Sequence, residues 1–341
     1  MASAEQLKAL VKSHIDRDDR QFYSVAMQVA AHEAKVGHGR LAVDIRDMID
    51  AARARIAADE QSGKLVPLVR PRGELAVLLT VAYPKCRLAD MVLDAHLSSQ
   101  IERILKEQRL LSRIREHGLS PRRKLLLVGP PGTGKTMTAS VLAAELGIPL
   151  FTVRLDALIT KFMGETAAKL RQIFDAVSEF RGVYFFDEFD AIGSQRGLAN
   201  DVGEIGRVLN SFLQMIENDQ SNSLIVAATN HAEILDFALF RRFDDVIEYH
   251  LPTADQAARL IKSRLGRFAP KPFPLKAIAS NADGLSYAEI RRAVDEAIKE
   301  AVMHEESRVD GEILNRALED RRKLSLRTDN KKAKHAGSTS R

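Results

Sequence analysis

The sequence predicts an α/β protein in which helices cover both faces of a parallel sheet, with a helical bundle before this sheet and a helical subdomain after it. Between residues 124 and 250, five short β-type runs alternate with helical patterns, which is typical of a parallel sheet. These runs cover residues 125–128, 150–153, 183–186, 224–228 and 246–249. After Pro252 the apolar periodicity is helical only.

The chain divides into five predicted segments. Residues 1–62 read as three amphipathic helices, because their apolar residues recur at spacings of three or four. Residues 63–88 begin with the composition of a linker, rich in Gly and Pro, and end in an apolar stretch that we expect to pack on the next domain. We place the large α/β subdomain at 89–250, the small helical subdomain at 251–326 and a disordered basic tail at 327–341.

Composition excludes several classes of protein. The chain has 341 residues, of which 45% are hydrophobic, so it can bury a core in two or three domains. A single cysteine, Cys86, excludes a disulfide framework and any site built from several thiolates, and we interpret it as an inert thiol. The longest apolar run is too short to cross a bilayer and the first residues lack a signal-peptide pattern, so we expect a cytoplasmic protein with no membrane partner.

The positive charge is concentrated at the C-terminal end. The net charge is +5, but residues 321–341 hold eight Lys or Arg against one Asp. Residues 1–320 therefore hold 43 basic and 45 acidic residues and carry a net charge of −2. We interpret the basic end as a solvated tail and expect no nucleic-acid partner.

A phosphate-binding loop is the most informative motif. Residues 129–136 match the pattern G-x-x-x-x-G-K-[ST] between an apolar run and a helical stretch that ends at Gly147. Glycines let backbone N–H groups turn toward a phosphate, and the helix N-terminus adds its positive dipole end. Lys135 is expected to reach the β- and γ-phosphates, and the Thr136 hydroxyl to bind Mg²⁺. The predicted nucleotide-binding residues are Gly129, Pro130, Pro131, Gly132, Thr133, Gly134, Lys135, Thr136 and Met137. The alternative, a chance glycine-rich turn, is disfavoured by the flanking strand and helix patterns.

Paired acids follow a second apolar run, 52 residues after Lys135, in the segment VYFFDEFD. At the end of a buried strand, Asp187 would help to hold the metal, partly through water, and Glu188 could polarise the attacking water. The alternative interpretation, without a catalytic role, is a strand that ends in solvated acids. We assign Asp190 a structural role.

Taken with AATNHAEILDFALFRRFD at residues 227–244, these motifs resemble the AAA ATPases, the ATPases associated with diverse cellular activities. The resemblance covers roughly residues 89–320 and implies that ATP and Mg²⁺ are bound. It implies that Asn230 is a sensor that positions the water, and that Arg241 and Arg242 are arginine fingers acting on a neighbouring subunit. The two arginines are adjacent, as in the microtubule-severing branch of the family, which leaves the division of their roles open.

Two further segments resemble parts of that family. TKFMGET, residues 160–166, is similar to the first pore loop, which implies that Phe162 and Met163 face the channel of a ring. The alternative is that Phe162 is a core residue of a short helix. DGLSYAEIRR, residues 283–292, is similar to the second sensor, which implies that Ala288 begins a helix over the nucleotide. Ser286 is expected to cap that helix.

A zinc site at His32 and Glu33 is rejected. The H-E-x-x-H motif needs a second histidine one turn later, but that position is Val36 and the next histidine is His38.

The favoured function is an ATP-hydrolysing ring ATPase, hexameric with nucleotide bound, that remodels or threads a protein recognised by residues 1–62. One alternative is a regulatory ATPase partner of a separate serine protease, because the layout resembles AAA proteins encoded beside subtilisin-like proteases in defence or plasmid-maintenance systems. Another is an ATP-dependent switch acting on nucleic acid, which the near-neutral body and Phe162 disfavour.

Overall fold

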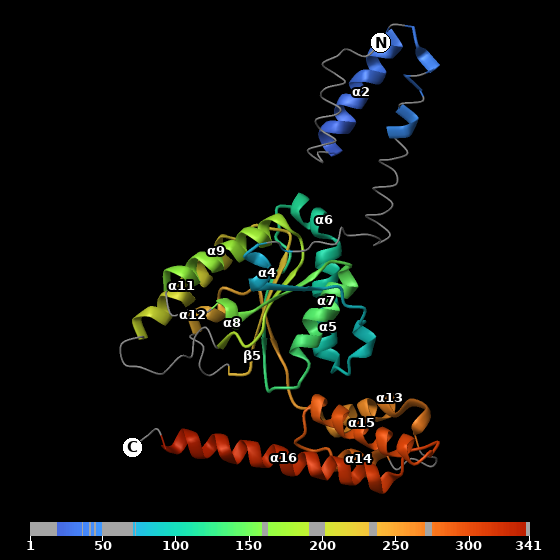
Figure 1. Ribbon diagram of the computed structural model, residues 1–341, viewed down its shortest axis with the longest axis vertical. Helices are drawn as coiled ribbons and strands as arrows, with labels where there is room; N and C mark the ends of the chain where they lie inside the picture. Colours follow the sequence, from blue (N-terminus) through green and yellow to red (C-terminus); the bar gives the residue numbers. More distant parts are fainter. Residues whose placement is uncertain are drawn as a thin grey trace. The chain divides into compact units, whose positions relative to one another are not determined.

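The computed structural model describes residues 19–35, 37–40, 42–43, 46–49, 71, 73–158, 163–190, 202–231, 237–269 and 275–338. The chain forms two compact units, Met1–Leu68 and Val69–Arg341, whereas composition places the first boundary near residue 63. In the first unit, helix α2 (Asp19–Lys35; Figure 1) corresponds to the second helix expected from periodicity. It buries Ala26, Val29 and Ala30. The first expected helix lies outside the described residues.

The second unit is built on a six-stranded sheet in the order β1-β3-β4-β5-β2-β6. The five strands predicted from sequence are all present, and they pair in parallel. They are β2 (Lys124–Val128), β3 (Leu150–Val153), β4 (Val183–Phe186), β5 (Leu224–Thr229) and β6 (Asp245–Glu248). All residues of β4 and β5 are buried, as expected for central strands covered on both faces.

The sixth strand, β1 (Leu79–Ala82), adds an edge strand that the sequence did not indicate to the predicted parallel sheet. It pairs antiparallel with β3, with Leu79 opposite Val153. The sequence assigns these residues to an apolar stretch at the end of a linker. In the structure that stretch divides into the short helix α4 (Leu75–Leu78) and this edge strand. Four extended residues are enough to extend a sheet at its edge, so no longer periodic pattern marks the strand.

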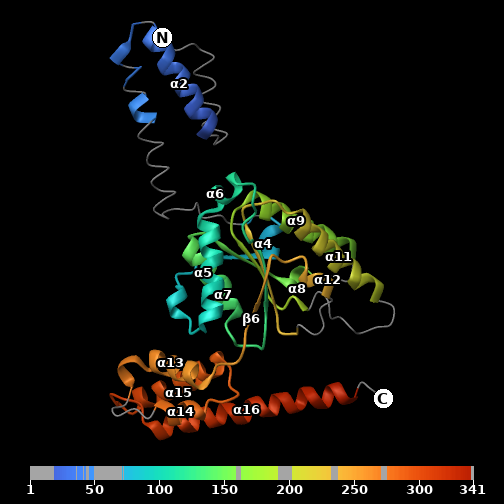
Figure 2. The same ribbon diagram turned by 180° about the vertical axis from the view of Figure 1, so that it is seen from behind.

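Helices cover the two faces of the sheet (Figures 1 and 2). One face packs against α5 (Ala95–Arg109) and α7 (Lys135–Leu146), and the other against α9 (Met163–Glu179) and α11 (Val202–Asn218). Alternate strand residues serve the two cores: Leu125 and Leu127 contribute to the α5 and α7 side, whereas Leu126 faces the α9 and α11 side. The shorter helices of this part are η1 (Leu88–Asp90), α6 (Leu111–Glu116), α8 (Leu155–Leu158) and α12 (Phe237–Phe240).

The segment after β6 is helical, as predicted, and has its own core. Its elements are α13 (Ala254–Leu265), η3 (Gly266–Phe268), α14 (Leu275–Ser280), α15 (Tyr287–Met303) and α16 (Gly311–Ser338). The core includes Ile261, Ile290, Val294 and Leu314.

Helix α16 differs from the expected disordered tail, because it continues through residue 327 to Ser338. Low apolar content argues against a core, but it does not prevent a packed helix from continuing through Lys- and Arg-rich sequence, since both residues favour helices. Within the described residues, no helix is long and apolar enough to span a membrane.

Candidate nucleotide-binding site

The loop at residues 129–134 joins the end of β2 to the start of α7 through three glycines with positive φ. An added Cβ would lie 2.2 Å from the Tyr249 carbonyl oxygen at Gly129 and 2.6 Å from Ser286 Oγ at Gly132. The Thr133 hydroxyl donates to the Pro130 carbonyl at 2.8 Å, which closes the loop on itself. Gly129 and Gly132 are therefore required for both backbone conformation and space, and the loop fits a backbone cradle for phosphate.

Lys135 is the first residue of α7 and its side chain is buried. Its ammonium donates to the carbonyl oxygens of Gly129 at 2.6 Å and Pro130 at 2.8 Å. Burial lowers the pKa of Lys135 to about 8, while the carboxylates of Asp187 and Asp190 oppose that shift. A partly desolvated cation held inside the loop is well suited to bind a phosphate group.

The paired acids lie close to this loop because β4, which precedes them, is separated from β2 only by β5. The Thr136 hydroxyl donates to Asp187 Oδ2 at 3.0 Å. A hydroxyl and a carboxylate are oxygen ligands of the kind that Mg²⁺ prefers, so this pair fits the predicted metal site. Glu188 is exposed and has a φ of 50°, in the left-handed region. Its N–H donates to Asp187 Oδ1 at 3.0 Å, which stabilises this uncommon backbone conformation.

Asn230 directly follows β5 and is half-buried. The strand that carries it is tied to the acidic loop by two hydrogen bonds. Phe189 N–H donates to the Ala228 carbonyl at 2.8 Å, and the Thr229 hydroxyl donates to Asp190 Oδ1 at 2.9 Å. The structure therefore brings Asn230 to the same edge of the sheet as Asp187 and Glu188, and it gives Asp190 a specific partner.

The start of α15 lies against the candidate phosphate-binding loop. Ala288 N–H donates to the Gly132 carbonyl at 3.1 Å. Ser286 caps α15, as predicted, and accepts a hydrogen bond from Glu289 N–H. Ala288 is thus next to the loop that the sequence assigns to phosphate. Of the other predicted loop residues, Pro131 is exposed and Met137 is half-buried in the first turn of α7.

The two arginines follow α12, Arg241 exposed and Arg242 half-exposed. Arg242 forms an ion pair with Glu217 near the end of α11. Two residues later, the Asp244 carboxylate accepts N–H groups at the start of β2, from Arg123 at 2.8 Å and Lys124 at 2.9 Å. The arginine segment is therefore anchored at the amino end of β2, whereas the phosphate-binding loop follows its carboxyl end.

The pore-loop assignment is only partly covered by the structure. Phe162 lies outside the described residues, and Met163 is described only as the first residue of α9, so the pore loop stays a prediction.

At the rejected zinc motif, Glu33 and His38 are hydrogen-bonded at 2.6 Å, and this hydrogen bond lowers the pKa of Glu33.

Three supporting residues have no marker in the sequence. The buried Thr138 and Tyr249 hydroxyls are hydrogen-bonded at 2.6 Å, and burial raises the pKa of Tyr249. Met91 lies 3.9 Å from the Thr138 hydroxyl through its sulfur, and its methyl group lies 3.4 Å from a Cβ built at Gly134. These contacts join residues 47 and 111 positions apart, so no local pattern could reveal them.

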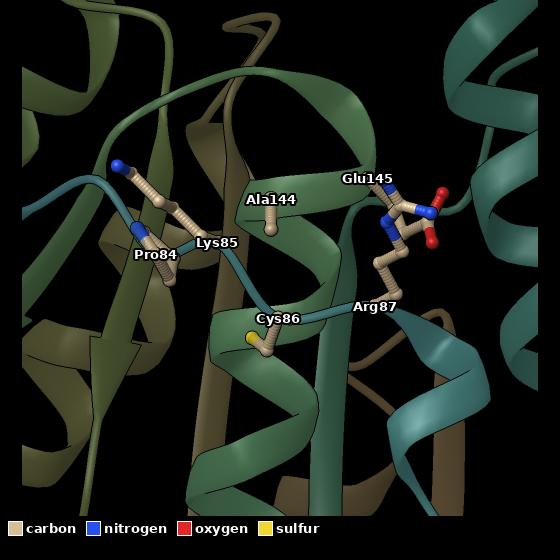
Figure 3. A pocket seen from close by; sticks show the side chains of 6 residues that line it. All are labelled: Pro84, Lys85, Cys86, Arg87, Ala144 and Glu145. Atoms are coloured by element: carbon tan, nitrogen blue, oxygen red, sulfur yellow. The ribbon is translucent and has the colours of Figure 1, made fainter.

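A separate cavity of about 370 Å³ lies beside the last turn of α7 (Figure 3). Glu145 at its rim is already engaged, since it accepts from Leu88 N–H at 3.2 Å and pairs with Arg109 at 2.9 Å. Burial raises the pKa of Cys86, in keeping with an inert thiol. We assign this cavity no part in the chemistry. It is lined by Pro84, Lys85, Cys86, Arg87, Ala144 and Glu145.

Comparison with known proteins agrees with the geometry. Residues 125–251 match the model of the ATPase family associated with various cellular activities (AAA). The uncharacterized AAA family ATPase y4kL of Sinorhizobium fredii is 36% identical over 320 residues, which cover 94% of this chain and 96% of that protein. The proteasome-activating nucleotidase of Thermococcus onnurineus is 32% identical over 78% of this chain and 69% of its own. The ATP-dependent zinc metalloprotease FtsH of Acidothermus cellulolyticus is 35% identical over 65% of this chain but only 35% of its own length.

Proposed function

Because this chain belongs to the ATPase family associated with various cellular activities and hydrolyses ATP, we propose that it is a Mg²⁺-dependent ring ATPase that remodels or threads a protein substrate. The observation that carries the proposal is the convergence of Lys135, the Thr136–Asp187 pair and Glu188 at the carboxyl ends of β2 and β4, which only β5 separates. This is where ligands bind in open α/β sheets.

The proposed catalytic roles follow from the chemistry of each group. Lys135 exchanges its carbonyl partners for the β- and γ-phosphates, and Glu188 accepts a proton from the attacking water. A Mg²⁺ ion held by Thr136 and, through water, by Asp187 would neutralise phosphate charge. Asn230 orients the attacking water.

In the proposed ring, a neighbouring subunit supplies further positive charge to the nucleotide. Arg241 and Arg242 act on the neighbouring subunit's nucleotide, and a guanidinium supplied in trans can increase the rate by ~10³ to 10⁵. Their anchoring through Asp244 at the amino end of β2, away from the phosphate-binding loop of the same chain, supports a role toward another subunit. A hexamer is the assembly we propose.

The proposed substrate is a polypeptide. Residues 1–62 would select it, and Phe162 would hold it in the channel, because an aromatic ring makes apolar contacts that tolerate many sequences. Two relatives support a protein substrate by name, since one is a metalloprotease and the other activates a proteasome. The same names favour a second candidate, a regulatory ATPase that works with a separate protease.

Substitution of Phe162 tests the threading function. We expect Phe162→Ala to leave basal ATP hydrolysis within a few-fold and to abolish its stimulation by an unfolded protein, because the grip is lost and the phosphate site is intact. Phe162→Tyr keeps the ring area and should keep the stimulation. Thermal unfolding of both variants is the control. A large loss of stability in Phe162→Ala would identify a core residue, and stimulation by DNA in place of protein would favour a nucleic-acid switch.

A further inference from the structure

We propose that Asp190 and Thr229 are positioning residues, which fix Asn230 relative to Glu188 so that both groups can act on one water molecule. The proposal rests on the function proposed above for Asn230. It gives Asp190 a role in turnover where the sequence indicates only a structural one.

The Thr229 hydroxyl lies at the centre of the arrangement. Thr229 is the last residue of β5 and is fully buried. Its hydroxyl donates to Asp190 Oδ1 at 2.9 Å and accepts from His231 N–H at 3.0 Å. One oxygen thus connects the residues on either side of Asn230. A hydroxyl that bonds the backbone two residues later is a local turn, and it sets the backbone of the residue between them.

The acidic loop is the second half of the arrangement. Phe189 N–H donates to the Ala228 carbonyl at 2.8 Å, and its fully buried ring packs 4.8 Å from that of Phe212. With the Thr229–Asp190 bond, two consecutive loop residues are joined to two consecutive strand residues. The loop that carries Glu188 and the strand end that carries Asn230 are therefore held together as one unit.

Fixed relative position matters because water must approach the phosphate with both groups in place. A misplacement of about 1 Å can lower a rate by about 100-fold without loss of binding. Replacing a residue that only stabilises the fold would lower the melting temperature and leave the turnover of the folded enzyme unchanged. Turnover at saturating ATP, measured beside nucleotide affinity and melting temperature, distinguishes the two roles.

The test compares removal of the bond with its retention. Thr229→Val and Asp190→Ala remove the bond, and both should lower kcat by about 10- to 100-fold with nucleotide Kd within about threefold of wild type. Thr229→Ser keeps the hydroxyl donor, and Asp190→Asn keeps an oxygen acceptor. Each should therefore have most of the turnover that Thr229→Val or Asp190→Ala loses. Asp190→Asn also separates the bond from the charge that Asp190 places near Lys135. The double variant Thr229→Val, Asp190→Ala should be no slower than the slower single variant, because the bond is lost only once.

Ser223, directly before the same strand, supplies a matched control. It precedes β5, is fully buried, and its hydroxyl donates to the Val177 carbonyl at 2.8 Å. Ser223→Ala should lower melting temperature without lowering kcat. If Thr229→Val and Asp190→Ala lower kcat no more than this control, the positioning role is overturned.

Asn230→Ala separates failure of this inference from failure of the proposed function. If Asn230→Ala keeps wild-type turnover, Asn230 is not the water-positioning residue and the proposed function loses that assignment. If Asn230→Ala is slow while Thr229→Val is not, only the positioning role is overturned. Should Thr229→Val fail to fold, the half-buried Asp190→Ala decides the outcome by the same measurements.

Discussion

The contact between Gly132 and the start of α15 leads to a prediction with an internal control. An added Cβ at Gly132 would lie 2.6 Å from Ser286 Oγ and 3.0 Å from Ala288 Cβ, and its φ is 76°. Gly284 has nearly the same φ, 79°, and nothing lies within 4 Å of its added Cβ. Gly284→Ala therefore introduces backbone strain alone, about 1–2 kcal/mol. Gly132→Ala adds overpacking of about 1–3 kcal/mol to the same strain.

Urea unfolding of both variants measures the difference, and nucleotide titration measures its effect on the site. We expect Gly132→Ala to be less stable than Gly284→Ala and to be the variant that loses ATP affinity, because only its loop must shift. Adding Ser286→Gly removes the nearest clashing atom at little cost, since glycine is accepted as a helix cap, and should restore part of the stability. Equal stability and equal affinity in the two alanine variants would refute the contact between the loop and α15.

Three further predictions concern the proposed chemistry. Lys135→Ala should abolish nucleotide binding while Glu188→Gln keeps it and stops hydrolysis, since the glutamate is needed only when water attacks; equal loss of binding in both, measured by titration, would contradict the assignment. With the pKa of Lys135 at about 8, phosphate binding should raise that pKa, so calorimetry in two buffers should detect proton uptake at pH 8.5 but not at pH 6.5, and affinity should fall as pH rises above 8. Absence of uptake at pH 8.5 would contradict it. Mixing an Arg241→Ala, Arg242→Ala subunit with a Lys135→Ala subunit should restore some ATPase activity, whereas full activity of a dilute monomer would remove the finger role from both arginines.

The parts of the site that could be predicted are those whose chemistry lies within a few consecutive residues. The loop at residues 129–136 is one such case, because glycine spacing, lysine and the following helix are all local. Ser286 is another, because its capping partner Glu289 is only three residues away. The alternation of short apolar runs with helical patterns likewise predicted the five parallel strands.

The remainder depends on contacts between distant segments. The run from Leu75 to Ala82 is apolar except for Thr80, and only pairing with β3 decides where helix α4 stops and strand β1 begins. The Thr138–Tyr249 hydrogen bond joins residues 111 positions apart. The hydrogen bond of Asp190 is a similar case, because its carboxylate has this partner only when β5 places Thr229 beside it.

Strand β2 connects two proposed functional segments, one at each end. The phosphate-binding loop follows Val128, and the arginine segment is attached to Arg123 and Lys124 through Asp244. The five residues of β2 span roughly 16 Å and are paired on both sides, so the sheet holds the strand stiff along its length. If Arg241 and Arg242 act on the next subunit as proposed, β2 would transmit a displacement of the loop to them. In the proposed ring, nucleotide occupancy of one subunit's site would then affect the neighbouring subunit's site through the backbone of β2.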